Sequence, residues 1–233
     1  MTHKNIVTNY YKVKTWSKCG RYYDAPIRPF EIYYVNPQEI REIPIHTPTG
    51  NTFVSDVRRG DWDINTSLLE STPLFKSFES RFKNNIEWEE TELYSQIIER
   101  IDQNESWKGY TTIDGVNQRL NYIDNLYQSI AEEGLKPNKV VRDSEDHFDG
   151  LQKHESIYWP SDEIVVDVGR NGKLLLRKGY NRVSLSRIAE VNQIPVRIRI
   201  RHEQWQQLRD KYINDGQKKK TEHPDLQFSR NHS

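Results

Sequence analysis

The chain has 233 residues, of which 34 are Lys or Arg and 34 are Asp or Glu, so its formal net charge at pH 7 is zero. Apolar residues make up only 34% of it, but the aromatic residues, at 11%, can bury enough area for the core of one elaborated domain. No apolar run approaches the ~18 residues of a membrane span, and Cys19 is the only cysteine, so we expect no membrane partner and no disulfide framework. A start without a secretory signal predicts a cytoplasmic protein.

Residues 1–60 are predicted to form a basic and aromatic segment with one strand. Residues 1–29 have no helical period, whereas residues 30–35 (FEIYYV) are typical of a strand. Pro44 and Pro48 then indicate a loop.

Residues 61–111 are predicted to be an acidic helical extension. Helices are expected over residues 66–84 and 88–103, and in the second of them apolar residues recur at helical spacing while acids take the other face. The apolar stripe consists of Trp88, Tyr94, Ile97, Ile98 and Ile101.

Residues 112–213 are predicted to form a mixed domain that ends in a helix. Its first helix is expected to be capped by Thr112 or Asp114 and to end at Gly134. Residues 142–162 are polar and show no period, so we expect them to be an inserted loop.

Two short apolar runs in the second half of this domain predict a hairpin. Its strands are expected at residues 164–168 and 173–176, and a helix is expected after Gly179. A final helix is predicted near residues 202–213, and residues 214–233 are expected to be a disordered tail.

Residues 194–200 alternate apolar residues with arginine, which predicts a strand with one buried face. The other face, with Arg197, Arg199 and Arg201, is expected to be solvated and paired with acids, and the alternative is that it contacts nucleic acid phosphates. The overlapping stretch 185–196 also has the pattern of a helix-turn-helix. On a helix the three arginines would scatter, so the strand is favoured.

The charges are unevenly distributed along the chain. Residues 61–105 contain eleven acids and four bases, a balance of −7, whereas residues 170–220 contain fourteen bases and four acids, a balance of +10. This asymmetry indicates either that the C-terminal half binds something anionic or that the two halves attract each other.

The junction between the second hairpin strand and its helix is the candidate site. A glycine there allows a sharp turn, so the first amides of the helix are free to bind an anion, which the helix dipole also favours. The predicted phosphate-binding residues are Gly179, Tyr180, Asn181, Arg182 and Ser184, with Arg177 and Lys178 as auxiliary cations. The alternative is a plain strand-turn-helix in which Arg182 pairs with an acid.

Three segments resemble, in the same order, the sequence boxes of the ParB/sulfiredoxin (ParB-like nuclease domain) superfamily. Residues 126–137 (LYQSIAEEGLKP) resemble its opening box, in which a helix ends in S-I-x-x-x-G before a proline. Residues 179–182 (GYNR) resemble its G-x-x-R box, and residues 194–196 (IPV) its closing strand. The resemblance covers residues 112–202, and residues 60–63 (GDWD) resemble a largely archaeal group of uncharacterised ParB-like proteins.

The resemblance implies an α+β fold: a ParB/sulfiredoxin-like domain with an α-rich N-terminal extension and a C-terminal helix. It also implies that Gly179 and Arg182 hold nucleotide phosphates. The superfamily includes CTP-dependent partitioning clamps, sulfiredoxins, free-serine kinases and nucleases, so the fold does not select an activity. Sulfiredoxins have their catalytic cysteine where this chain has Tyr180, and the clamps have a second arginine where it has Asn181. Neither of these two activities is therefore expected.

We therefore expect a nucleotide-binding protein that takes ATP or CTP, either as a binding protein alone or as a small-molecule kinase or other phosphoryl-transfer enzyme. The alternative is a non-catalytic module that binds nucleic acid or protein through the basic C-terminal half. Glu133 and Asp167 lie beside the boxes and are auxiliary candidates.

No histidine or cysteine spacing indicates a structural metal site. Acids of the inserted loop could hold Mg²⁺ beside the nucleotide or could serve solubility alone. They are Asp143, Glu145, Asp146 and Asp149.

Overall fold

The computed structural model describes residues 3–46, 48–49, 55–138, 163–216 and 223–227. Its strands form a mixed seven-stranded sheet in the order β1-β7-β5-β6-β2-β4. β3 is not on this path: it pairs with the last residues of β7, whereas β1 pairs with the first. The strands are β1 (Tyr33–Val35), β2 (Glu42–Pro44), β3 (Asp56–Arg58), β4 (Thr66–Leu68), β5 (Ile164–Val168), β6 (Leu174–Lys178) and β7 (Ile194–His202).

β5 and β7 lie inside the sheet, and every residue of both strands is buried. β5 pairs antiparallel with β6 and parallel with β7. The other edge of β7 pairs antiparallel with β1 and parallel with β3. α6 (Tyr180–Ile188) connects β6 to β7, so its N-terminus lies at the end of β6.

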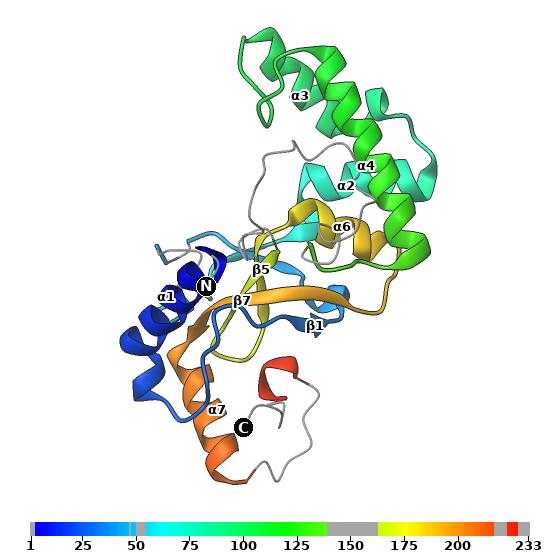
Figure 1. Ribbon diagram of the computed structural model, residues 1–233. Helices are drawn as coiled ribbons and strands as arrows, with labels where there is room; N and C mark the ends of the chain where they lie inside the picture. The colour runs from blue at the N-terminus through cyan, green and yellow to red at the C-terminus, as the bar shows by residue number, and fades with distance from the viewer. Residues whose placement is uncertain (1–2, 47, 50–54, 139–162, 217–222, 228–233) are drawn as a thin grey trace.

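One face of the sheet is covered by α6, and the helical extension packs on α6 (Figure 1). The extension consists of α2 (Pro73–Asn84), α3 (Glu92–Asp102) and α4 (Ile113–Glu133). Each of these helices begins after a threonine whose hydroxyl accepts a backbone N–H of the first turn, which satisfies one of the free donors there. The threonines are Thr72, Thr91 and Thr112.

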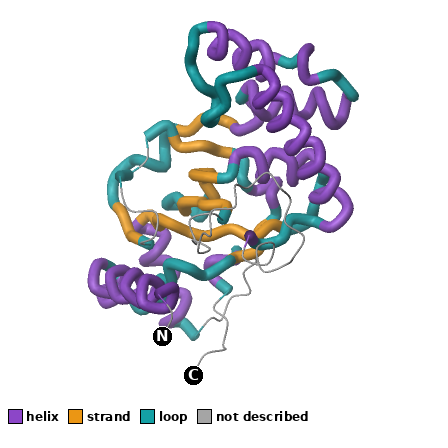
Figure 2. The backbone as a smooth tube through the Cα atoms, turned by 45° about the horizontal axis from the view of Figure 1, so that its top comes forward, coloured by secondary structure: helices purple, strands orange, loops and turns teal. Residues whose placement is uncertain are grey.

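The opposite face of the sheet is covered by α1 (His3–Lys18), by α7 (Glu203–Asn214) and by the short helix η6 (Pro224–Leu226). Figure 2 shows the strands between these two groups of helices. The remaining short helices are η1 (Gly20–Tyr22), η2 (Pro37–Glu39), η3 (Leu69–Ser71) and η4 (Trp88–Glu90). Within the described ranges, no helix is both long enough and apolar enough to span a bilayer.

The mixed α/β architecture agrees with the expected fold class, and several elements agree closely with their predicted ranges. The strand predicted at 164–168 is β5, and the helix predicted from Thr112 is α4, with Thr112 as its cap. β7 begins at Ile194, which confirms the strand and excludes the helix-turn-helix at this position.

The prediction that β7 has a solvated face was wrong. Arg197, Arg199 and Arg201 are at most 2% exposed, because α1, α7 and η6 cover this face of the sheet. The predicted pairing with acids is confirmed for two of them, since Arg199 pairs with Asp167 and Arg201 with Asp225.

Four other predictions were wrong. The segment 1–60 contains α1 and three strands instead of one strand, and the helix expected from residue 66 begins at Pro73, after β4. The sheet takes four strands from residues before 112, so the mixed domain does not begin there. Asp225 and Leu226, placed in the disordered tail, are buried because they pack under β7.

Candidate anion-binding site

A cavity of about 520 Å³ lies where β6 meets α6, between this junction and the helical extension. Its lining includes four cationic side chains from three separate segments of the chain, and no acid is among the described residues that line it. The cations are Lys108, Arg119, Lys178 and Arg182. An apolar wall is formed by Leu74, Tyr122, Leu126 and Tyr180.

Gly179 gives the junction its sharp turn. Its φ of +98° lies in the left-handed region that glycine adopts without strain, and a Cβ here would lie 2.8 Å from Cγ1 of Ile164. α6 begins at the next residue, and its first intrahelical N–H bond is that of Val183 to the Gly179 carbonyl. The amides of residues 180–182 are therefore donors of the helix N-terminus, where an anion is favoured.

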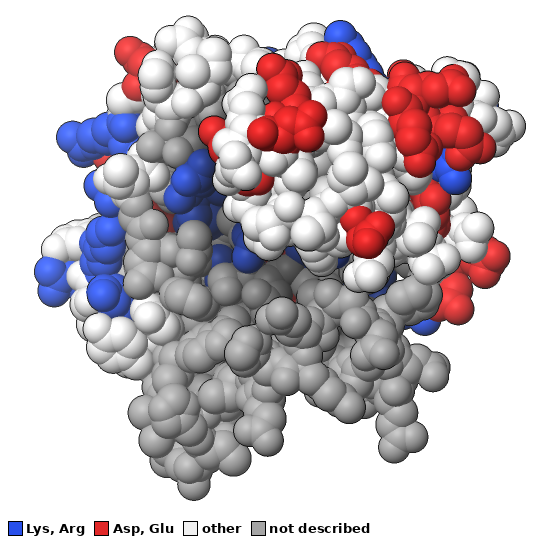
Figure 3. Space-filling model, turned by 90° about the horizontal axis from the view of Figure 1, so that it is seen from above, with Lys and Arg blue, Asp and Glu red and all other residues white. Residues whose placement is uncertain are grey.

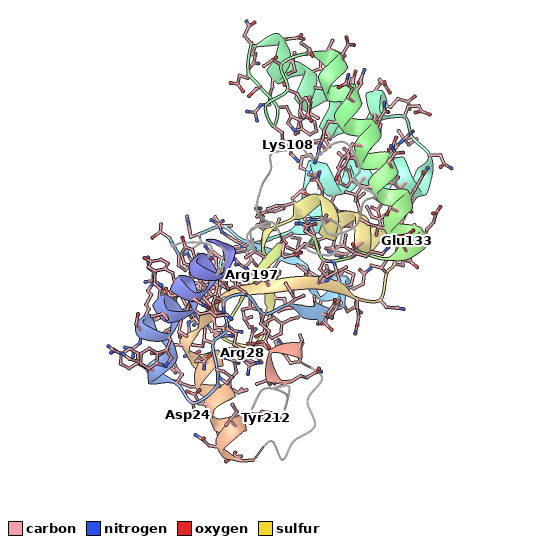
Figure 4. All side chains as sticks on the ribbon, viewed as in Figure 1. Asp24, Arg28, Lys108, Glu133, Arg197 and Tyr212 are labelled. Carbon is pink, nitrogen blue, oxygen red and sulfur yellow. The ribbon has the colours of Figure 1, made fainter. Side chains whose placement is uncertain are left out.

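Lys108 reaches the cavity from a two-residue hairpin turn between α3 and α4. Trp107 and Tyr110 exchange two backbone hydrogen bonds of 2.9 Å, and Lys108 and Gly109 have φ values of +50° and +89°. These angles are typical of a type I′ turn, in which asparagine is favoured over lysine at the first central position. The Lys108 Nζ donates a 3.3 Å hydrogen bond to Oδ1 of Asn181, and Figure 4 labels Lys108 in the loop above α6.

Arg119 belongs to α4 and lines the same cavity as Lys108. Its guanidinium lies 4.5 Å from the centre of the Tyr122 ring. Desolvation by the surrounding protein, together with the charge of Arg119, lowers the pKa of Lys108. Burial raises the pKa of the Tyr180 phenol, so this hydroxyl is a hydrogen-bond donor and not a base at neutral pH.

The structure brings five of the predicted site residues together at the cavity. They are Lys178, Gly179, Tyr180, Asn181 and Arg182. Ser184, on α6, is fully buried. Neither Ser184 nor Arg177 is among the residues that line the cavity.

The two predicted auxiliary carboxylates lie in ion pairs elsewhere. Glu133 is exposed at the end of α4 and pairs with Lys136 at 2.6 Å. Asp167 is fully buried in β5 and accepts two hydrogen bonds from the Arg199 guanidinium at 2.9 and 2.6 Å. Neither group is placed to act on a ligand in the cavity.

Lys108 and Arg119 were missed by the sequence interpretation. A local pattern existed for each, since Lys108 precedes a glycine between two aromatic residues and Arg119 shares a helical stripe with Tyr122 and Leu126. Neither pattern indicates a ligand, because only the tertiary fold brings them to Gly179.

Among the described residues no group of His, Cys, Asp and Glu side chains is arranged to hold a metal ion. The four loop acids considered for Mg²⁺ lie outside the described residues.

A second cavity, of about 540 Å³, lies at the other end of α6. Its charged side chains largely pair with one another, as Arg187 does with Glu70 and Lys83 with Glu79. Among the described residues, the cavity at the N-terminus of α6 is lined by cations and by no acid, whereas this second cavity is lined by charges of both signs.

Comparison of the chain with protein-family models, with curated proteins and with solved structures found no match in any of the three. A function for the basic cavity is therefore inferred from its own residues and from the resemblance noted in the sequence.

Proposed function

We propose that this protein binds a nucleotide, ATP or CTP, with its phosphates in the basic cavity at the N-terminus of α6. The observation that carries the proposal is the convergence of Lys108, Arg119, Lys178 and Arg182 on the first amides of that helix. Phosphate oxygens are the ligands that such a combination of guanidinium, ammonium and amide donors suits best.

The rest of the cavity suits the base and sugar of a nucleotide. Two tyrosines and two leucines provide an apolar wall beside the cations, and the volume lies within the range of small-molecule pockets, about 300–1,000 Å³. The ParB/sulfiredoxin-like order of sequence boxes, with G-x-x-R at residues 179–182, supports the same ligand.

Phosphoryl transfer to a small molecule would be the enzymatic extension of this proposal. Such an enzyme needs a base near the acceptor hydroxyl. Glu133 and Asp167 are held in ion pairs outside the cavity, and Tyr180 keeps its proton. The described residues thus support nucleotide binding more directly than they support transfer.

The alternative is a module that binds nucleic acid or protein through the basic C-terminal half. Much of the positive charge of this half is buried in the protein and is not available to a partner. Five arginines of this half are at most 7% exposed: Arg187, Arg197, Arg199, Arg201 and Arg209. Arg170 and Lys173 pair with acids of the N-terminal half. Figure 3 shows acidic side chains gathered over the helical side of the molecule, which disfavours binding of a nucleic acid to this face.

Isothermal titration with ATP and with CTP, each with and without Mg²⁺, tests the proposal. We expect Arg182→Ala to weaken binding about ten-fold or more, because it removes a charge-assisted hydrogen bond worth about 1.5–3 kcal/mol. Arg100→Ala is the matched control, since it removes the same charge from an exposed pair with Glu105.

Equal affinity of Arg182→Ala and the parent for both nucleotides would overturn the phosphate assignment. Binding of duplex DNA or RNA that weakens steeply between 50 and 200 mM salt, of the kind expected at ~6–10 phosphate contacts, would favour the alternative.

A further inference from the structure

The helix α1 presents its apolar side chains to solvent, which reverses the usual arrangement. Among residues 8–18, whose side chains the structure describes, Thr15 is the one buried residue of α1. Tyr10, Val13 and Trp16 follow one another at a spacing of three residues and are 57%, 64% and 60% exposed. A surface helix ordinarily packs its apolar stripe against the core, so an exposed stripe of this kind indicates an interaction surface.

Lysines without acidic partners accompany this stripe. Lys12 and Lys14 are exposed, and in the described part of the chain neither of them pairs with an acid. The Lys14 Nζ lies 5.5 Å from the centre of the Tyr10 ring. Residues 3–23 contain five Lys or Arg and no Asp or Glu, so the charge here is complementary to an anionic partner. We refer to the following residues as the α1 surface: Tyr10, Lys12, Val13, Lys14 and Trp16.

We infer that the α1 surface binds single-stranded nucleic acid, with bases stacked on the rings of Tyr10 and Trp16. The phosphates of the strand lie beside Lys12 and Lys14. Exposed rings next to lysines suit such a strand, because every base has a face that can stack and every nucleotide carries a negative charge. A duplex offers the same phosphates, but its bases are already stacked on one another, so we expect a preference for the single strand.

The composition of the α1 surface favours a nucleic acid over a lipid bilayer. Binding to a bilayer scales with the apolar area that is inserted, and Val13 is the one exposed aliphatic side chain among residues 8–18. Aromatic rings predominate instead, and the short helix η1 adds another one directly after α1. There the Arg21 guanidinium lies 4.7 Å from the centre of the Tyr22 ring, which is also exposed.

The α1 surface is separate from the basic cavity. α1 lies on the face of the sheet opposite to α6, at whose N-terminus the cavity is found (Figure 1). It also belongs to the N-terminal part of the chain and not to the basic C-terminal half. The inference therefore neither needs the proposed nucleotide site nor excludes it.

Fluorescence anisotropy of labelled oligo(dT) of about 16 nucleotides, titrated with the full chain, tests the inference. We expect Trp16→Leu to weaken binding about five-fold or more, because leucine preserves the helix and the apolar character but removes the ring on which a base stacks. Trp16→Phe, which keeps a ring, is expected to retain most of the affinity. Tyr34→Leu, which removes an exposed tyrosine from β1, is the matched control.

The salt dependence of the same titration tests the charges. We expect replacement of Lys12 and Lys14 by glutamine to reduce the slope of log affinity against log salt by about 0.7 for each phosphate contact that is lost. An unchanged slope would contradict the assignment of phosphates to these lysines.

Four further results would overturn the inference. They are the absence of binding by the parent protein, equal affinity of Trp16→Leu and the parent, a duplex of the same length that binds as tightly as the single strand, and a loss on Arg182→Ala as large as that on Trp16→Leu. The last result would place the strand in the basic cavity. Phosphatidylserine vesicles that bind the parent and Trp16→Leu equally, without any binding of oligo(dT), would assign the α1 surface to a membrane instead.

Discussion

Gly179 is the residue on which the shape of the basic cavity depends most directly. Gly179→Ala would place an alanine at φ of +98° and its Cβ 2.8 Å from the buried side chain of Ile164. The backbone strain and the overpacking each cost about 1–2 kcal/mol, so we expect the free energy of unfolding in urea to fall by about 2–4 kcal/mol.

Gly60 provides the control for this prediction. Its φ is +93°, but an added Cβ would meet nothing within 4 Å, so Gly60→Ala should cost only the backbone strain, about 1–2 kcal/mol. Equal losses at the two positions would show that the contact with Ile164 contributes nothing to the stability of the junction.

The residues of the site differ in how far the sequence could predict them. Gly179 and Arg182 belong to a local pattern, a glycine followed by a helix with an early arginine, and such a pattern can be recognised in a short window. Arg119 is about 60 residues away along the chain, and Lys108 is more than 70 residues away. Their role arises from the packing of the extension over α6, which no local periodicity encodes.

At the level of elements, residues 223–227 fasten the C-terminal end of the described chain to the sheet. Asp225 accepts hydrogen bonds from Arg201 and from Trp205 Nε1, and His223 packs against the Trp205 ring at 4.5 Å. His223 Nε2 lies 2.9 Å from the Gly172 carbonyl, and its Nδ1 accepts the Asp225 amide. The carbonyl can only accept, so His223 is neutral with its proton on Nε2.

This arrangement predicts that stability falls as the pH falls from 7 to 5. Burial lowers the pKa of His223 below its ordinary 6.5, so under acid conditions the unfolded chain binds a proton that the folded chain excludes. Asp225, whose pKa is lowered despite its burial because of Arg201 and Arg209, loses its contribution only at more acidic pH. We expect His223→Asn, which keeps an acceptor for the Asp225 amide, to flatten the dependence measured by urea unfolding. A slope identical to that of the parent would contradict this account.

The strands that the sequence missed are those whose pattern depends on their neighbours. β2, β3 and β4 have three residues each, too few for a period of two to be visible. β7 alternates correctly, but its arginines are buried because a second layer of chain covers them, and alternation alone does not reveal that layer. α4 and β5 were predictable because their apolar residues repeat over a whole element.

At the level of the whole molecule, the acidic and basic parts of the chain are joined by ion pairs at specific points. Arg170, in the β5–β6 turn, donates its amide to Oδ2 of Asp63 at 2.7 Å and its guanidinium to both Asp63 and Asp61. Although burial opposes ionisation, the bonds from Arg170 lower the pKa of Asp63. Part of the charge asymmetry in the sequence is thus satisfied within the protein.

Asp63→Asn and Asp61→Asn compare the contribution to stability of a buried partner of Arg170 with that of an exposed partner. The Asp63 side chain is 3% exposed and that of Asp61 is 78% exposed. We expect Asp63→Asn to lower the free energy of unfolding by about 1–2 kcal/mol, and Asp61→Asn by less than about 0.5 kcal/mol. Similar losses for the two variants in thermal or urea unfolding would show that burial of this carboxylate does not matter.

The position of β7 in the sheet also determines when the early strands can find their partner during synthesis. Among the described strands, β1 and β3 pair only with β7, and their partners in β7 lie about 160 and about 145 residues further along. At about 5–20 residues per second, a ribosome needs roughly 10–30 s to make that intervening chain. Throughout this interval the early strands have edges without partners, so a nascent chain that stalls before residue 194 should be a preferred client of chaperones and proteases.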